Sequence, residues 1–307
     1  MSDFWKKVDK TLRYHGRQAA MALRGAWWDV RPVKATRPVF VVGCSRAGTT
    51  LVYKTLSESR ELGTLQRETH DFWAELHPLQ AKNWESHALA AADASEHDRD
   101  CVTRYYYAWT GNTRFVDKNN QNGLCVPYLY RLFPDACFIY VKRSPGDNIN
   151  SLIEGWGRPD EFAGWSDDLP SRVAIEDGRY KRWCFFLADG WREYTTAGIE
   201  EVCAFQYKIM NQAILKARAL VPKQQWTEVF YEDLVRDPVG SFRNTFHYCG
   251  LDFDAQLQRH TQDVLHTPYN AFSEIRVDKW KESHNHEKIA RILPKVQKTA
   301  LAMGYTA

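Results

Sequence analysis

A short buried strand that leads through a glycine-containing loop into a helix is the feature that most constrains this 307-residue chain. Residues 39–42 read Val-Phe-Val-Val, a continuous apolar run typical of a strand buried on both faces of a parallel sheet. Residues 43–51 then read Gly-Cys-Ser-Arg-Ala-Gly-Thr-Thr-Leu and open a helix. Backbone N–H groups at such a helix start, aided by the helix dipole, make a cradle for an anion. The stretch therefore predicts a phosphate-binding loop, with a plain strand-to-helix connection as the alternative.

The cation in this loop is not where a P-loop nucleotide triphosphatase has it. Gly43 and Gly48 have the spacing of the pattern GxxxxGK[ST], but Thr49 occupies the position of its lysine. The positive charge lies upstream, at Arg46. This arrangement argues against Mg²⁺-ATP chemistry and favours an anionic group held by arginine and hydroxyl groups without a metal.

The rest of the chain alternates between strand-like and helix-like segments. Further strands are expected at residues 62–65, 114–116, 137–141 and 228–231. Helices are expected at residues 49–59, 126–133, 148–156, 175–194, 200–220 and 289–301. This alternation predicts an α/β fold with a central parallel β-sheet flanked by helices on both faces, of the P-loop-like kind.

The first residues differ from the rest in charge and pattern. The net charge of the chain is +3, but nine Lys and Arg residues against three Asp residues give residues 1–37 a charge of +6, which leaves −3 for the remainder. Basic and aromatic residues interleave at helical spacing up to Arg31-Pro32, where the helix is expected to end. We predict a basic, aromatic, helical N-terminal arm, residues 1–36, and one α/β domain, residues 37–307.

Composition narrows the class of protein and its partners. The small net charge argues against nucleic acid as a partner, and no apolar run reaches the ~20 residues of a membrane span. Seven cysteines, an odd number without CxxC spacing, favour reduced, buried thiols over disulfides or a zinc site. A cytoplasmic protein is therefore expected. Its arm would act as a peripheral contact with an anionic membrane, as a homodimer arm, or as a packing helix.

The strand predicted at residues 137–141 is followed directly by two positively charged residues. Residues 136–143 read Ala-Cys-Phe-Ile-Tyr-Val-Lys-Arg, and residues 144–147, Ser-Pro-Gly-Asp, then have the pattern of a helix start. Ser151 lies about two turns into that helix. Because ligands of open α/β sheets bind at the carboxyl ends of the strands, Arg143 and Ser151 are expected to face the same anion as the first loop.

The first loop resembles that of a known family. Residues 45–50, Ser-Arg-Ala-Gly-Thr-Thr, resemble the [PS]-[RK]-S-G-T-T loop of sulfotransferases that use 3′-phosphoadenosine-5′-phosphosulfate (PAPS). Arg143 and Ser151 match that family's 3′-phosphate-binding arginine and serine. Three further segments are similar to the family's, in the same order: residues 117–119, 132–139 and 226–238. The likeness extends from about residue 37 to residue 281 and leaves the arm outside.

The resemblance implies an enzyme that moves the sulfuryl group of PAPS in line to a hydroxyl or amine. The acceptor would be a carbohydrate, glycolipid or small molecule, the product nucleotide 3′-phosphoadenosine-5′-phosphate (PAP), and no metal would be required. The positions implied for the nucleotide are Arg46, Ala47, Gly48, Thr49, Thr50, Arg143, Ser151, Tyr231, Arg276 and Lys279.

Two parts of this resemblance are less regular. Arg276 and Lys279 belong to residues 270–281, which resemble the loop that closes over the nucleotide in this family; a solvated basic loop is the alternative. Ala47 replaces the usual loop serine, and residues 119–120, Asn-Asn, replace Thr-Pro. Because the cations are retained, these departures predict weakened or rearranged contacts rather than an inactive site.

The catalytic residues are implied by the same resemblance. Residues 66–73, Gln-Arg-Glu-Thr-His-Asp-Phe-Trp, are similar to a segment of carbohydrate sulfotransferases in which the glutamate acts as base. We therefore expect Glu68 to be the general base. His70 is the rival base, or orients Glu68, or is an ordinary surface residue. Lys118, if it is not a surface lysine, and Arg46 would neutralise charge on the transferring group.

Two alternative functions and the acceptor are not decided by these residues. The alternatives are a P-loop phosphotransferase that uses ATP and a nucleotide-binding protein without catalysis. Aromatic residues near the motifs are candidates either for the acceptor site or for the core: residues 105–109, Trp156, Trp165, Trp183 and Trp191.

Overall fold

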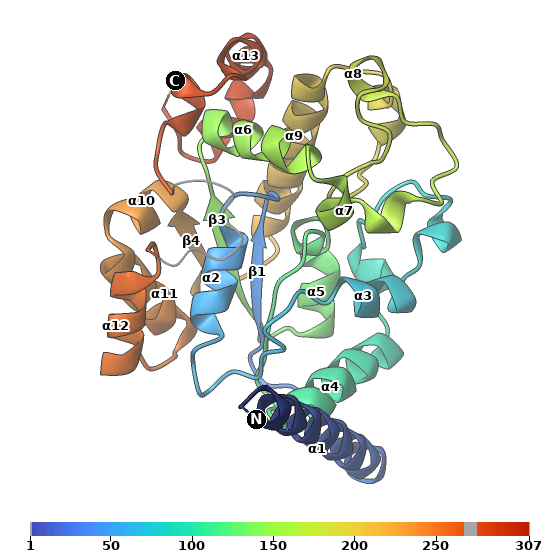
Figure 1. Ribbon diagram of the computed structural model, residues 1–307, viewed down its shortest axis with the longest axis vertical. Coiled ribbons are helices and arrows are strands. Elements are labelled where there is room, and N and C mark those ends of the chain that lie inside the picture. Colours follow the sequence, from blue (N-terminus) through green and yellow to red (C-terminus); the bar gives the residue numbers. More distant parts are fainter. Residues whose placement is uncertain (1, 267–274, 307) are drawn as a thin grey trace.

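Four parallel strands form the centre of the protein (Figure 1). The computed structural model describes residues 2–266 and 275–306. The strands are β1 (Val39–Gly43), β2 (Val116–Asp117), β3 (Cys137–Lys142) and β4 (Trp226–Phe230). Their order is β2-β1-β3-β4, and every neighbouring pair is parallel. All carboxyl ends therefore lie at one edge of the sheet.

Helices cover both faces of this sheet, as Figure 1 shows. The helices of the described chain are α1 (Ser2–Val30), α2 (Thr49–Leu56), α3 (His70–Leu76), α4 (Glu96–Thr110), α5 (Val126–Leu132), α6 (Pro145–Trp156), α7 (Pro159–Phe162), α8 (Ile175–Gly178), α9 (Ile199–Arg218), α10 (Tyr231–Arg236), α11 (Pro238–Cys249), α12 (Ala255–Asp263) and α13 (His286–Ala302). The predicted α/β fold, with a parallel sheet between two helical layers, is confirmed.

The side chains of β1 alternate between two hydrophobic cores. Phe40 and Val42 belong to the core that includes residues of α5, α6 and α9, whereas Val39 and Val41 belong to the core that includes residues of α2 and α11. All four side chains are buried, as expected for a strand covered on both faces. This burial fixes the end of β1, and with it the loop that follows, between the two layers of helices.

Two predicted elements do not form as expected. Residues 62–65 contribute a single bridge, between Gly63 and Phe115, instead of a strand. Residues 175–194 are helical only near their ends, in α8 and in a 3-10 turn at Trp191–Tyr194. Between these turns Phe185 has a φ of 72°, and residues 183–188 are buried. Residues 183–188 are apolar at every position and have no solvent-facing stripe. Their pattern therefore does not distinguish a buried helix from an irregular buried segment.

Most of the predicted N-terminal arm forms one continuous helix, α1, which packs along α4 near the bottom of the view in Figure 1. Asp29 accepts two hydrogen bonds from Arg104 of α4, at 2.7 and 3.0 Å. Leu23, Trp27 and Val30 remain exposed. Among the residues that the structure describes, no helix has both the length and the apolar character needed to cross a membrane. Contact of the arm with a membrane surface or with a second copy stays a prediction.

Candidate functional site

The loop between β1 and α2 turns sharply at the carboxyl edge of the sheet. Arg46 has a φ of 66° and Gly48 a φ of 99°, both in the left-handed region. A Cβ on Gly48 would lie 2.6 Å from Cδ2 of Tyr231, the first residue of α10. Glycine is therefore required at this position both by backbone conformation and by the close approach of the ring.

Replacing Gly48 by alanine is expected to weaken binding of PAP, the nucleotide implied by the sequence, by about tenfold or more. An L-residue is strained at this φ, and the added methyl group displaces the ring of Tyr231. Isothermal titration calorimetry measures the change. Gly16→Ala is the matched control, because nothing lies within 4 Å of its Cβ position. An unchanged PAP affinity in Gly48→Ala would contradict the placement of the nucleotide in this loop.

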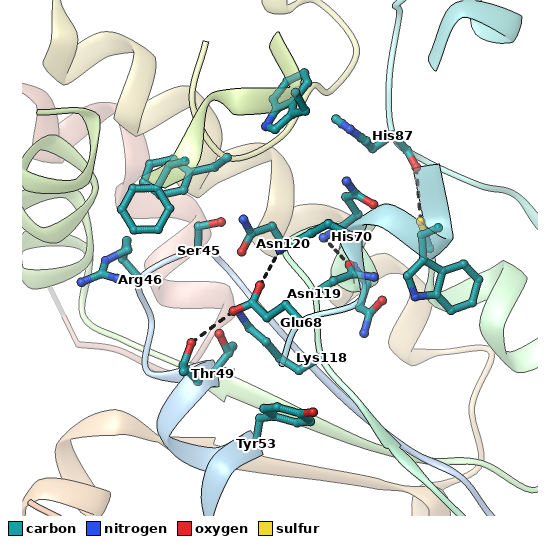
Figure 2. A pocket seen from close by; sticks show the side chains of 18 of the residues that line it. Ser45, Arg46, Thr49, Tyr53, Glu68, His70, His87, Lys118, Asn119 and Asn120 are labelled. Atoms are coloured by element: carbon teal, nitrogen blue, oxygen red, sulfur yellow. Dashed lines mark hydrogen bonds and ion pairs between the residues drawn. The ribbon is translucent and has the colours of Figure 1, made fainter. Parts of the chain in front are cut away.

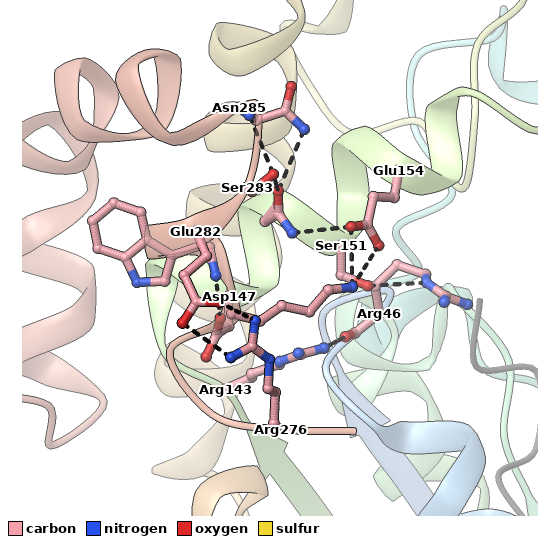
Figure 3. A network of polar contacts seen from close by, with 12 residues as sticks. Arg46, Arg143, Asp147, Ser151, Glu154, Arg276, Glu282, Ser283 and Asn285 are labelled. Carbon is pink, nitrogen blue, oxygen red and sulfur yellow. Dashed lines mark hydrogen bonds and ion pairs between the residues drawn. The ribbon is translucent and has the colours of Figure 1, made fainter. Parts of the chain in front are cut away.

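Two arginine residues meet at the loop (Figure 3). Arg143, which follows β3, donates from Nη1 to the carbonyl oxygen of Arg46 at 2.9 Å. Arg46 in turn donates from Nε to Oγ of Ser151, on α6, at 3.4 Å. The guanidinium of Arg143 lies 4.2 Å from the ring centroid of Tyr231. The structure thus brings together the loop arginine, the strand-end arginine and the helix serine that the sequence assigned to one anion.

Buried donors around this contact lack partners. Burial and the neighbouring charge of Arg143 lower the pKa of Arg46 to about 10. Within the described part of the chain, Nε of Arg143 and Oγ of Ser45 are buried and have no hydrogen-bond partner. Such groups are costly unless something accepts their hydrogen bonds. The loop is therefore suited to a ligand that has acceptor oxygens and negative charge.

Asp147 of α6 fixes a C-terminal segment beside this site (Figure 3). Its carboxylate accepts hydrogen bonds from the backbone N–H groups of Asp278 at 2.7 Å and of Trp280 at 3.0 Å. A Cβ on Gly146 would collide with the indole of Trp280, so the helix start is shaped to receive that ring. Sequence reasoning identified residues 144–147 as a helix start but missed this anchoring role.

The two basic residues of that segment have different positions. Lys279 lines the same cavity as Arg46 and pairs with Glu154 of α6 at 3.2 Å. Arg276 is not among the lining residues, and its guanidinium donates to Glu282 at 3.0 Å. Residues 270–274 of the expected covering loop lie outside the described residues.

Glu68 is at the centre of a polar cluster next to the loop (Figure 2). Its Oε1 pairs with the ammonium of Lys118 and accepts from Oγ1 of Thr50 at 3.5 Å. Its Oε2 lies 2.7 Å from Nε2 of His70. Lys118 itself is buried. The structure therefore brings the two candidate bases and the candidate charge-neutralising lysine into direct contact.

The surroundings of Glu68 keep its carboxylate ionised. Burial raises its pKa, but the charge of Lys118 and the hydrogen bond with His70 outweigh burial and lower the pKa to about 2. Because this value is far below neutrality, the carboxylate is charged throughout the physiological range. It is available as a proton acceptor, although a weak one while both partners hold it.

The loop after β2, which carries Lys118, is held by side chains. Asp117 accepts from Oγ1 of Thr69 at 2.7 Å and from Nδ2 of Asn122 at 3.0 Å. Oδ1 of Asn119 accepts from the backbone N–H groups two and three residues further on, at 2.7 and 3.0 Å. Asn119 thus closes the turn through its side chain.

A cavity of about 1080 Å³ joins these groups. Its lining includes most of the predicted site residues: Arg46, Gly48, Thr49, Thr50, Glu68, His70, Lys118, Arg143, Ser151, Tyr231 and Lys279. Ala47 is not among them; its side chain is buried in the core and its N–H donates to the carbonyl of Cys44. The described residues contain no group of three or more His, Cys, Asp or Glu side chains placed to hold a metal.

The cavity continues past Glu68 into a part that sequence reasoning only touched. Of the aromatic candidates, Trp165 lines it, whereas Trp156, Trp183 and Trp191 are fully buried in the core. Trp73 and His87 also line it. Trp73 ends the segment 66–73 that contains Glu68, whereas His87 belongs to no motif and had no signal in the sequence.

Comparison with known proteins decides the family. The model described as "Sulfotransferase family" matches residues 38–255, which include the loop after β1, Glu68 and Arg143. The chain belongs to the sulfotransferase family. Among curated members, it is 25% identical over 158 residues to omega-hydroxy-beta-dihydromenaquinone-9 sulfotransferase Stf3 of Mycobacterium bovis. That match covers 51% of this chain and 34% of Stf3, so the chain spans about a third of that relative's length.

Solved sulfotransferase structures share the fold of this family member. Sulfotransferase STF9 from Mycobacterium avium is 15% identical, with 93% of this chain and 84% of that chain covered and a TM-score of 0.51. The sulfotransferase from Alicyclobacillus acidocaldarius is also 15% identical, with 89% and 98% covered and a TM-score of 0.50. The family and the sulfotransferase fold expected from the loop after β1 are confirmed, and all of α1 precedes the matched residues.

Proposed function

We propose that this protein transfers the sulfuryl group of PAPS to an acceptor hydroxyl. Membership of the sulfotransferase family supports the proposal, and so does the anion-binding character of the loop before α2. Transfer breaks the bond between sulfur and a phosphate oxygen of the nucleotide, forms a bond from sulfur to the acceptor oxygen, and passes the hydroxyl proton to a base.

The meeting of Arg46 and Arg143 is the observation that carries this proposal. The two guanidinium groups repel each other, which contributes to the lowered pKa of Arg46, and a bound anion relieves that repulsion. The unpartnered Nε of Arg143 and Oγ of Ser45 offer donors to its oxygens. Gly48 lets the loop pass close to the ring of Tyr231, because a Cβ at this position would collide with that ring. These residues fit a nucleotide with several anionic groups.

The family pattern divides these contacts between the two ends of the nucleotide. Arg46, Gly48, Thr49 and Thr50 would hold the 5′-phosphosulfate. Arg143 and Ser151 would hold the 3′-phosphate, and this second group would favour PAPS over ATP. Tyr231 and Lys279, which line the same cavity, would border the nucleotide.

Glu68 is the proposed general base. Its pKa of about 2 makes it weak while Lys118 and His70 are bound to it. A sulfuryl group beside Thr50 attracts the ammonium of Lys118, and a weakened ion pair raises the pKa of Glu68 toward its ordinary value. Lys118 would thereby neutralise charge on the transferring group and free Glu68 to accept the proton. His70 would orient Glu68. His70 would instead be the base if Glu68→Gln keeps its turnover while His70→Ala loses it.

A hydroxyl acceptor is supported by the curated relative. Stf3 is named for an omega-hydroxy-dihydromenaquinone, and its match covers about half of this chain. We extend to this protein only the reacting group, an alcohol.

Nucleotide binding and a transfer assay test this function together. PAP is expected to bind about tenfold or more tightly than ATP, with or without Mg²⁺, because Thr49 replaces the P-loop lysine. PAPS labelled in its sulfur is expected to label an alcohol in a panel of lipid, glycan and small-molecule acceptors. ATP binding that requires Mg²⁺ would favour a phosphotransferase instead. PAP binding without transfer to any acceptor would favour a nucleotide-binding protein without catalysis.

A further inference from the structure

The part of the cavity beyond Glu68 has aromatic walls. We define the acceptor chamber by five lining residues that come from separate segments of the chain: Trp73, Trp84, His87, Tyr128 and Trp165. In Figure 2, His87 lies at the opposite end of the view from Arg46, with Glu68 between them. A molecule that reaches from Glu68 into the chamber would therefore contact these aromatic rings as well as polar lining side chains such as Asn119 and Asn120.

His87 presents an uncharged donor to this chamber. Its Nδ1 accepts the backbone N–H of Leu187 at 2.8 Å, so the ring hydrogen must be on Nε2. Its backbone is held as well, because its N–H donates to the carbonyl of Leu187 and its carbonyl accepts from Sγ of Cys125. Burial lowers the pKa of His87 to about 3, which keeps the ring neutral at every physiological pH. Among the described residues, Nε2 has no hydrogen-bond partner.

Trp73 adds a second uncharged donor. Its side chain is 6% exposed, and its indole Nε1 is buried with no partner in the described part of the chain. The core tryptophans behave differently: Nε1 of Trp156 donates to Gln206 at 3.0 Å, and Nε1 of Trp183 donates to the carbonyl of Phe186 at 2.7 Å. An indole N–H can only donate, so the group that satisfies Trp73 must be an acceptor.

The cations of the cavity outside the anion loop are already engaged. Lys82 donates to the carbonyl of Ala88 at 2.9 Å and pairs with Asp93 at 3.4 Å. Arg67 pairs with Asp71 at 3.6 Å, Lys118 with Glu68, and Lys279 with Glu154 at 3.2 Å. Lys54 donates to the carbonyl of Gln66. A carboxylate or sulfate that entered the chamber would lose its water without gaining a charged partner, which is strongly unfavourable.

We propose that the acceptor is an uncharged alcohol with an apolar or aromatic body and a second, uncharged oxygen that accepts a hydrogen bond from His87 or Trp73. This inference rests on the proposed sulfuryl transfer and adds the chemical class of the acceptor. Neutral donors in an aromatic chamber select an ether, ketone or hydroxyl oxygen, and they select against anionic glycans and hydroxy acids.

A matched set of ten-carbon alcohols tests the class of acceptor. The probes are 1-decanol, a series of decanols with a ketone at successive positions, and 10-hydroxydecanoate, each assayed with sulfur-labelled PAPS. The best hydroxyketone is expected to have a kcat/KM about five- to tenfold above that of decanol. Hydroxydecanoate is expected to fall at least about a hundredfold below the best hydroxyketone.

Two substitutions test the residues. Trp73→Phe and His87→Phe each remove one donor, and at least one is expected to bring the hydroxyketone-to-decanol ratio close to one. Trp109→Phe, which changes a partly exposed indole outside the cavity, is the matched control and should keep the ratio. In the ¹H–¹⁵N spectrum, the indole signal that is missing in Trp73→Phe identifies Trp73 in the wild type. That signal or the His87 ring N–H should shift with the best hydroxyketone more than with decanol.

The outcomes separate this inference from the proposed function. Preference for hydroxydecanoate, or a ratio unaffected by both substitutions, overturns the acceptor class while sulfuryl transfer stands. Sulfation of anionic glycans but of none of the alcohols overturns it in the same way. Failure to bind PAP together with failure to sulfate any acceptor overturns the proposed function itself.

Discussion

Replacing Glu68 by glutamine is expected to lower kcat for sulfuryl transfer by about 10²–10⁴-fold while PAP affinity stays within about twofold. Glutamine keeps the size and the hydrogen-bonding oxygen of the side chain but cannot accept the acceptor's proton. It also leaves the buried ammonium of Lys118 without its carboxylate, so the thermal midpoint is measured alongside. Single-turnover kinetics with labelled PAPS checks the chemical step directly.

Glu75→Gln is the matched control for that variant. It removes the same charge from an exposed position on α3 and should leave turnover unchanged. If Glu68→Gln turns over normally while His70→Ala is inactive, the base is His70 and Glu68 orients it.

The pH profile separates the two bases independently. A base must be deprotonated, so activity is lost as the pH falls through its pKa. With the pKa of Glu68 lowered to about 2, kcat/KM should stay level well below the pH at which an ordinary glutamate protonates. A fall in kcat/KM with a midpoint near neutrality would contradict Glu68 as the base.

Arg143→Ala is expected to raise the dissociation constant of PAP by about tenfold to 150-fold, the loss of about 1.5–3 kcal/mol in charge-assisted hydrogen bonds. The substitution also removes the support that Arg143 gives to the loop through the carbonyl of Arg46 and the ring of Tyr231. Calorimetry with PAP and with AMP, which lacks the 3′-phosphate, isolates the contact. If Arg143 binds the 3′-phosphate, the variant should bind PAP and AMP with nearly equal affinity.

Arg236→Ala controls for the loss of positive charge, since Arg236 lies on α10 and is 71% exposed in its side chain. Arg143→Lys should recover part of the affinity, because the charge returns without the planar guanidinium. A PAP-to-AMP ratio that is unchanged in Arg143→Ala would place the 3′-phosphate elsewhere.

The anion loop was predictable because its requirements are local. A buried strand, a left-handed glycine and a helix start follow each other within about a dozen residues, and each has its own pattern. The partnership of Arg46 with Arg143 was predictable for a related reason: both follow neighbouring parallel strands, whose carboxyl ends share one edge.

The acceptor chamber was not predictable in the same way. His87 comes from an irregular segment and Trp165 from a short 3-10 turn, and they contact each other at 5.0 Å between ring centroids only because the chain folds back on itself. The error at residues 175–194 has the same origin. An irregular buried segment is stabilised by contacts with residues distant in sequence. Its hydrophobic pattern has no periodicity from which its conformation could be predicted.

The attachment of the C-terminal segment to α6 has a consequence for tolerance to substitution. Asp147 receives main-chain N–H groups, so the hydrogen bonds are indifferent to which side chains stand at Asp278 or Trp280. Side-chain contacts add to this anchor: Trp280 packs on Gly146, Lys279 pairs with Glu154, and Ser283 donates to Asn150. Substitutions at Asp278 or Trp280 would thus leave the hydrogen-bond donors to Asp147 in place, and the helix that carries Ser151 holds the segment through backbone as well as side-chain contacts.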